Sequence, residues 1–204
     1  MPEKRNIGRR EKQKIGSGIV SPSVIRFPRP EGLRREIYIF RSADAFHEAS
    51  LLALRRATTT DNETQRFNLG LVYGVNGALA VELYLKLLLE IEGKQVPETH
   101  DLQKLYLQLG RESRAKLKKR HDELAKDHQL LSGFSKRYGI KMELESLLED
   151  GKDVFKQFRY LFEGIRDRTK GLSFFLELFG QVVRNRILDH RPEWLSEEPT
   201  SPTH

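Results

Sequence analysis

The chain has 204 residues, of which 38% are hydrophobic and 32% charged, values typical of a soluble protein with one domain and a core of its own. It contains no cysteine, which excludes disulfides and cysteine-ligated zinc or iron–sulfur sites. The net charge is +7, but residues 1–36 contribute +6 of it, so the rest of the chain gives no general argument for nucleic acid.

The two ends of the chain show no sustained periodicity. Residues 1–35 combine glycines and prolines with basic side chains, which predicts a mobile basic arm that either binds polyanions or keeps the protein soluble. Residues 191–204 are expected to form a loose C-terminal tail. The N-terminus lacks the apolar stretch of a secretory signal, so a cytoplasmic protein is expected.

The first predicted helix begins near Ile37 and is followed by a break at residues 58–64, where Thr60 or Asp61 could cap the next helix. Residues 69–91 are apolar nearly all round, as in a membrane span or the central helix of a bundle. Ionisable groups near the middle of this stretch, Glu82 and Lys86, would be costly in lipid and favour the central helix without membrane contact. Gly93 provides its C-terminal stop.

The later segments also show helical periodicity. A helix that Thr99 or Asp101 could cap precedes a highly charged, exposed helix over 111–129, and residues 131–141 are interpreted as a connection. Apolar residues at helical spacing continue through 144–165 and 172–187. The prediction is an all-α bundle of about five helices over residues 36–190.

Two charged features could bind a ligand. Glu82 and Lys86 stand four residues apart on the apolar helix, as a structural ion pair or as groups that orient a ligand. Lys116, Lys119 and Arg120 can share one helix face, which would attract RNA phosphates or simply be solvated. The six histidines are scattered without convincing metal-ligand spacing, so no metal and no cofactor is expected.

Three motifs in order resemble the HEPN superfamily of small helical domains. They are ELYLKLLL at residues 82–89, HDLQKL at 100–105 and RYLFE at 159–163. The resemblance spans roughly residues 37–190 and implies an all-helical fold. Many members are metal-independent endoribonucleases in toxin–antitoxin, phage-defence or RNA-processing systems.

The shared R-x(4–6)-H motif of that superfamily matches Arg184 to His190, with Asn185 in the polar position after the arginine. The resemblance implies that His190 is the general acid and base, that Arg184 stabilises charge on the scissile phosphate, and that Asn185 positions one of them. It also implies a homodimer, RNA as a partner, and an antitoxin or nucleotidyltransferase-type protein partner.

The spacing of this motif leaves an alternative open. The same pattern occurs at Arg41–His47 and Arg114–His121, so the spacing alone carries little information. On a straight helix Arg184 and His190 would point about 120° apart, whereas Arg186 and His190 would share a face. A second subunit could complete the site, or the chain could be a catalytically inert HEPN-like module that binds a nucleotide, a nucleic acid or a protein.

Overall fold

The computed structural model describes residues 34–139, 141–152 and 176–196, and within these ranges every regular element is a helix. The expected all-α class is confirmed. The described ranges hold seven α-helices instead of about five, because three short helices join the long ones. The predicted RYLFE motif lies outside the described residues.

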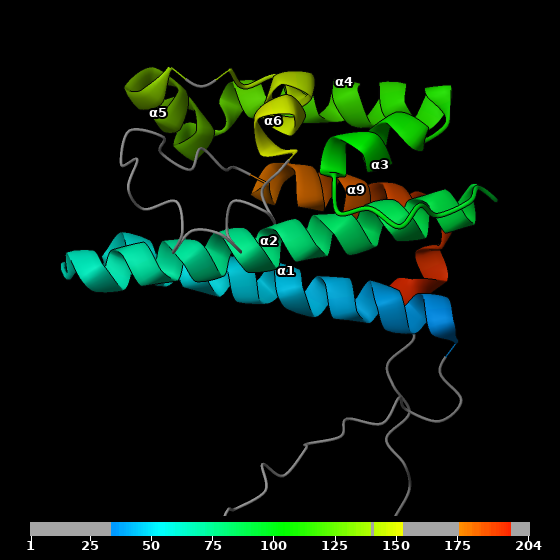
Figure 1. Cartoon of the computed structure of the whole chain (residues 1–204), viewed down its shortest axis with the longest axis horizontal. Helices are drawn as coiled ribbons and strands as arrows, with labels where there is room; N and C mark the ends of the chain where they lie inside the picture. Colours follow the sequence, from blue (N-terminus) through cyan, green and yellow to red (C-terminus); the bar gives the residue numbers. More distant parts are fainter. Residues whose placement is uncertain (1–33, 140, 153–175, 197–204) are drawn as a thin grey trace, which may run out of the picture.

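Two long antiparallel helices form the base of the molecule (Figure 1). These are α1 (Arg35–Thr59) and α2 (Glu63–Ile91). Each helix buries small side chains, Ala43 on α1 and Ala78 on α2 among them, and the two helices pack along their length. Ser50 Oγ donates to the carbonyl of Tyr73 across the contact, and a Cβ on Gly77 would lie 3.1 Å from that hydroxyl oxygen.

The ends of α2 are fixed by local hydrogen bonds. Asn62 is its N-cap and accepts a hydrogen bond from the Gln65 amide at 2.9 Å, so the expected caps Thr60 and Asp61 were wrong by one or two residues. Thr60 supports the cap by accepting from the Asn62 amide. Gly93 has φ +68, a left-handed conformation suited to glycine, and ends α2 as predicted.

Helix α2 is the centre of the bundle and packs against α1, α3 (Leu102–Gln108) and α9 (Glu177–His190). Its length and hydropathy would suffice for a membrane span, but half of that apolar window is buried inside the protein. Glu82, only 4% exposed, is paired within the protein rather than facing lipid. These features agree with the predicted role of α2 as the central helix of a bundle.

A second group of helices lies on the other side of α2, where α3 and α9 pack on α2 and α4 packs on α9 (Figure 1). It contains α3 (Leu102–Gln108), α4 (Arg111–Asp127), α5 (Gln129–Tyr138) and α6 (Leu144–Gly151). Asp101 caps α3 by accepting from the Lys104 amide, as predicted.

The interpretation of residues 131–141 as a connection was wrong, because most of them belong to α5. The His128 ring caps this helix at the Leu131 amide, and Leu131 itself is fully buried. Gly139, at φ +67, ends α5 in a left-handed turn. An interior glycine at 133 made the helix hard to recognise, since glycine weakens a helical pattern.

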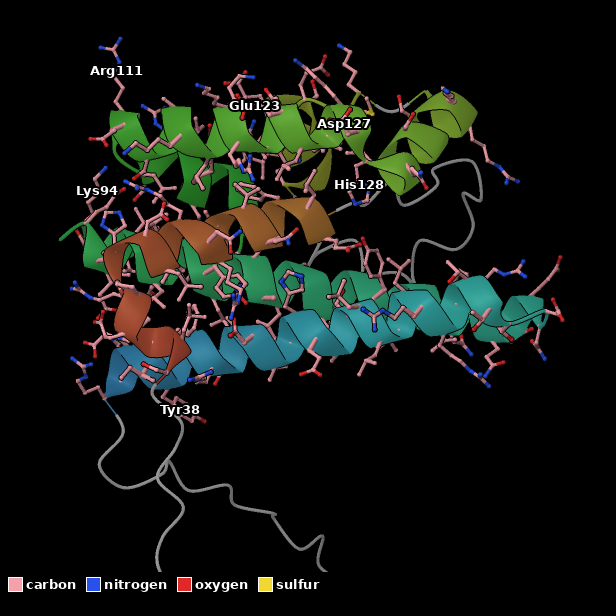
Figure 2. The ribbon with its side chains drawn as sticks, turned by 180° about the vertical axis from the view of Figure 1, so that it is seen from behind. Tyr38, Lys94, Arg111, Glu123, Asp127 and His128 are labelled. Atoms are coloured by element: carbon pink, nitrogen blue, oxygen red, sulfur yellow. The ribbon has the colours of Figure 1, made fainter. Side chains whose placement is uncertain are left out.

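Helix α9 (Glu177–His190) lies between α4 and the α1–α2 pair, and Figure 2 shows it from behind. The short 3₁₀ helix η1 (Pro192–Leu195) follows it and lies against the beginning of α1. Residues 191–196 were expected in the loose tail, yet Trp194 is buried with its ring 5.4 Å from that of Phe40. The folded part therefore extends past the expected boundary at residue 190.

Candidate nucleic-acid interface

A groove of about 640 Å³ runs along the surface where α4 lies beside α9. All three predicted phosphate-binding cations of α4 line it, and the predicted Asn185 lines it from α9. The complete lining is Lys116, Leu117, Lys119, Arg120, Glu123, Asn185, Arg186, Leu188, Asp189 and Leu195. Residues that were proposed separately from the sequence thus meet in one place.

The helix periodicity explains why these side chains face the groove. On α4, Leu117, His121 and Ala125 are buried, so the neighbouring lysines and Arg120 stay on the outer face. On α9, Val183 and Ile187 enter the core, and Asn185 and Arg186 between them line the groove. Figure 2 labels Glu123, which marks the α4 wall of the groove.

The groove is cationic and its positive charges are only weakly neutralised. Its ionisable lining contains four cations and two carboxylates. Lys116 Nζ lies 2.6 Å from Glu112 Oε1, Lys119 lies 4.0 Å from Glu123, and Arg186 Nη1 lies 3.6 Å from Asp189. All three of these carboxylate side chains are exposed. Exposed pairs of this kind contribute about 0–1 kcal/mol, so an incoming phosphate can replace the carboxylates.

The apolar part of the lining gives the groove a second character. Leu117 is buried at its base, and Leu188 and the largely exposed Leu195 stand along it. Cationic walls suit phosphates, and apolar side chains suit the faces of bases or sugars. The groove can therefore hold a short stretch of a polyanion that also has apolar surface.

Arg184, the predicted catalytic arginine, points away from this groove toward α1. Its Nε and Nη2 donate to the two carboxylate oxygens of Asp44 at 2.8 and 2.9 Å. Its guanidinium carbon also lies 5.4 Å from the centre of the Phe40 ring, a cation–π contact. Bidentate pairing is the strongest arrangement of an arginine with a carboxylate, and it fixes the orientation of the guanidinium.

Two further side chains complete the cluster around Asp44. The Tyr84 hydroxyl donates to Asp44, and burial, reinforced by that carboxylate, raises the pKa of Tyr84 well above its usual range. His47 lies beside Tyr84 with the ring centres 6.3 Å apart, and burial lowers its pKa. The charge of Arg184 lowers the pKa of His47 further and Asp44 opposes this, so the ring is neutral at pH 7.

The sequence did not predict the roles of Asp44 and Tyr84. Asp44 is separated from Arg184 by 140 residues, and no local spacing connects them. The only available signal was a carboxylate and a tyrosine on the inner sides of two predicted helices, which is common in bundles. The pairing needs the three-dimensional arrangement of α1, α2 and α9.

His190 ends α9 on a different side from Arg184. Burial lowers its pKa, the nearby positive charge of Arg186 adds to this, and Asp189 and Glu92 oppose it. Its Nε2 is enclosed and has no hydrogen-bond partner among the described residues. In the described part of the chain no hydrogen bond or ion pair joins His190 to Arg184, so their joint action stays a prediction that one chain alone does not satisfy.

The Glu82–Lys86 pair forms as its spacing predicts, with Lys86 Nζ 2.7 Å from Glu82 Oε1. The structure adds His100, whose Nδ1 lies 3.0 Å from Glu82 Oε2. The buried carboxylate thereby ties the loop before α3 to the centre of α2. The pair lies outside the lining of the α4–α9 groove, and its geometry matches a structural role.

The two other matches to the arginine–histidine pattern lie in the body of the bundle. His121 is fully buried, packs edge-on against Phe179, and its Nδ1 lies 3.2 Å from Asp122. Arg41 donates from Nη2 to the carbonyl of Trp194 and so holds η1 against α1. Among the residues that the structure describes, no three histidine, aspartate or glutamate side chains gather to hold a metal ion.

No protein-family model, curated protein or solved structure matches this chain. Its function is therefore inferred from its own residues and their geometry.

Proposed function

We propose that this protein is a HEPN-like RNA-binding protein and that RNA lies in the α4–α9 groove. One observation carries the proposal: Lys116, Lys119 and Arg120 from α4, which the sequence predicts to attract RNA phosphates, line the same groove as Asn185 from α9, the polar residue of the R-x(4–6)-H motif. Arg186 adds a fourth cation there. Binding would gain its free energy from counterion release, which any phosphate backbone provides.

The resemblance to HEPN proteins supports RNA over other polyanions. It also supports a homodimer and an antitoxin or nucleotidyltransferase-type partner, and the N-terminal sequence without an apolar stretch supports a cytoplasmic protein. The inert form of such a module would bind RNA through this groove without cutting it. In both forms the groove cations are the contacts on which affinity depends.

Fluorescence anisotropy with a labelled, unstructured RNA of about twenty nucleotides tests the proposal. The triple change Lys116→Gln, Lys119→Gln and Arg120→Gln should weaken binding by tenfold or more at low salt. Arg111→Gln is the matched control, because Arg111 is an exposed cation of α4 that does not line the groove. Absence of RNA binding by the unmodified protein, or an equal loss in the control, would refute the proposal.

Two alternatives to a specific RNA-binding function are separated by further measurements. A protein-binding module should still elute as a complex with its partner when coexpressed from its own operon. A polyanion-binding protein without RNA preference should bind heparin and single-stranded DNA as strongly as RNA.

A further inference from the structure

The chain leaves its last described helix at the edge of the α4–α9 groove. Leu195, the last residue of η1, lines the groove and is 60% exposed. Residues 197–204, which follow Ser196, lie outside the described residues. The segment after η1 therefore starts from a point that already belongs to the groove wall.

Contacts with the rest of the bundle hold this exit point in place. Trp194 is buried beside the ring of Phe40, and Arg41 Nη2 donates to the Trp194 carbonyl at 2.9 Å. The amide and the hydroxyl of Ser196 both donate to the Glu193 carbonyl, at 3.1 and 3.0 Å. These contacts fix the place where the chain leaves η1, so the segment after it is tethered beside the groove.

The first two residues of that segment are acidic. Residues 197–204 contain Glu197 and Glu198 and no lysine or arginine. Successive Cα atoms are about 3.8 Å apart, so the Cα atoms of Glu197 and Glu198 lie within about 8 and 11 Å of that of Leu195. The covalent chain itself thus brings two negative charges to the groove.

The groove has an excess of positive charge that these carboxylates can neutralise. Its lining holds four cations and two carboxylates, and Arg120 has no ion pair among the described residues. Lys119 lies 4.0 Å from Glu123, an exposed pair that a second carboxylate can replace at little cost. A guanidinium binds a carboxylate through two parallel hydrogen bonds, which makes Arg120 the strongest available partner.

We propose that the acidic segment that begins at Glu197 occupies the α4–α9 groove, with its carboxylates on Lys119 and Arg120. The consequence for RNA rests on the proposed function: RNA has to displace the segment before its phosphates reach these cations. Weakly bound polyanions are then excluded from the groove, whereas RNA that contacts several cations at once is not.

The short tether makes such a contact effective although each ion pair is weak. A group confined to a sphere of about 11 Å radius has an effective concentration of about 0.3 M. Exposed ion pairs contribute about 0–1 kcal/mol each, so two of them fill the groove for a large part of the time only because the partner is tethered. An untethered acidic peptide would need a similar concentration in solution.

Zero-length cross-linking locates the segment without RNA. A carbodiimide joins a carboxylate directly to an amine, and the full chain, isolated as a monomer after the reaction at low salt, is digested for mass spectrometry. Glu197 or Glu198 should be linked to Lys116 or Lys119.

Two lysine contacts serve as controls in the same sample. The Lys116–Glu112 pair, whose atoms lie 2.6 Å apart, is the positive control. Lys126 is an exposed lysine of α4 that does not line the groove, and it should form no link to the segment.

RNA affinity tests the competition. The double change Glu197→Gln and Glu198→Gln should strengthen RNA binding about three- to fivefold at low salt, because the carboxylates no longer compete with phosphates. The gain should vanish near 0.5 M salt, an ionic strength at which exposed charges are screened within roughly 5 Å. Glu193→Gln is the matched control, since Glu193 is an exposed acid of η1 outside the groove lining, and should change the affinity less than about twofold.

A double-mutant comparison separates docking from a general effect of charge. In a chain that carries Lys119→Gln and Arg120→Gln, the Glu197→Gln, Glu198→Gln change should no longer strengthen RNA binding, because the carboxylates have lost their partners.

Two results would overturn the inference. One is the absence of links between the segment and the groove lysines in a sample where the Lys116–Glu112 link forms. The other is RNA binding whose affinity the Glu197→Gln, Glu198→Gln change leaves unaltered. If neither chain binds RNA, the proposed function is refuted, and the cross-links alone decide whether the segment occupies the groove.

Discussion

Removal of the Asp44 carboxylate is expected to destabilise the protein by about 2–4 kcal/mol, because two partners lose their acceptor. The Tyr84 ring is completely buried, so in Asp44→Ala its hydroxyl loses its acceptor and water cannot reach it easily. That stranded donor costs about 1–3 kcal/mol. The Asp44 and Arg184 side chains are 20% and 29% exposed, so solvent screens their ion pair and its loss adds only about 1 kcal/mol.

Urea denaturation at pH 7 measures this loss in the free energy of unfolding. In thermal denaturation the same loss corresponds to a fall in melting temperature of roughly 5–12 °C. Asp44→Asn keeps an acceptor for Tyr84 and should cost about 1 kcal/mol. Tyr84→Phe removes the donor itself, so the double variant Asp44→Ala, Tyr84→Phe should be less destabilised than the sum of its two single changes. A loss below about 0.5 kcal/mol for Asp44→Ala, or strict additivity in this cycle, would refute the reasoning.

Three other predictions concern acid stability, salt and close packing. Burial lowers the pKa of His121, so the folded protein binds fewer protons than the unfolded chain, and the free energy of unfolding should fall as pH drops below about 6.5. His121→Phe should reduce this dependence of the free energy of unfolding on pH by up to about 1.4 kcal/mol per pH unit, measured by urea denaturation from pH 5 to 7. The logarithm of the RNA association constant should fall with the logarithm of the salt concentration with a slope of about −2 to −3, for three or four phosphate contacts. The double change Lys119→Gln and Arg120→Gln should reduce the magnitude of this slope by about one, and an unchanged slope would exclude both cations from the interface. A Cβ at Gly180 would lie 3.2 Å from ring atoms of His47, so Gly180→Val should lower the stability by about 1–3 kcal/mol in thermal denaturation, and an unchanged melting temperature would show that the ring moves away at no cost.

The sequence predicted the helical class and the central helix because both depend on local patterns. The long apolar stretch, its stop at Gly93 and the cap at Asp101 are all recognisable from consecutive residues. The same local patterns led to a wrong prediction at α5, because this helix is short and contains Gly133. Its stability comes from the burial of Leu131 rather than from a long apolar pattern. Tertiary packing stabilises this segment as a helix, and the spacing of its apolar residues does not predict that packing.

The predicted site residues divide along the same line. Lys116, Lys119 and Arg120 lie on one helix, so their common face follows from the spacing alone. Their meeting with Asn185 depends on which helix packs beside α4, and no local pattern of residues predicts that. Asp44 remained unassigned for the same reason, because its partner lies 140 residues away.

Arg184 and Arg186 lie within one turn of α9 but have different surroundings: Arg184 pairs with Asp44 on α1, and Arg186 lines the surface groove. The two side chains leave the helix about 200° apart, so one must face α1 when the other faces α4. Asp44 lies on α1 and pairs with Arg184, the arginine that faces it. Arg186 lies on the other side of α9 and therefore lines the groove. A motif defined by residue spacing alone cannot indicate which of these two arginines faces the groove. The carboxylate on α1 does distinguish them, because an arginine held by two hydrogen bonds in the folded state would have to leave that partner before it could stabilise a phosphate.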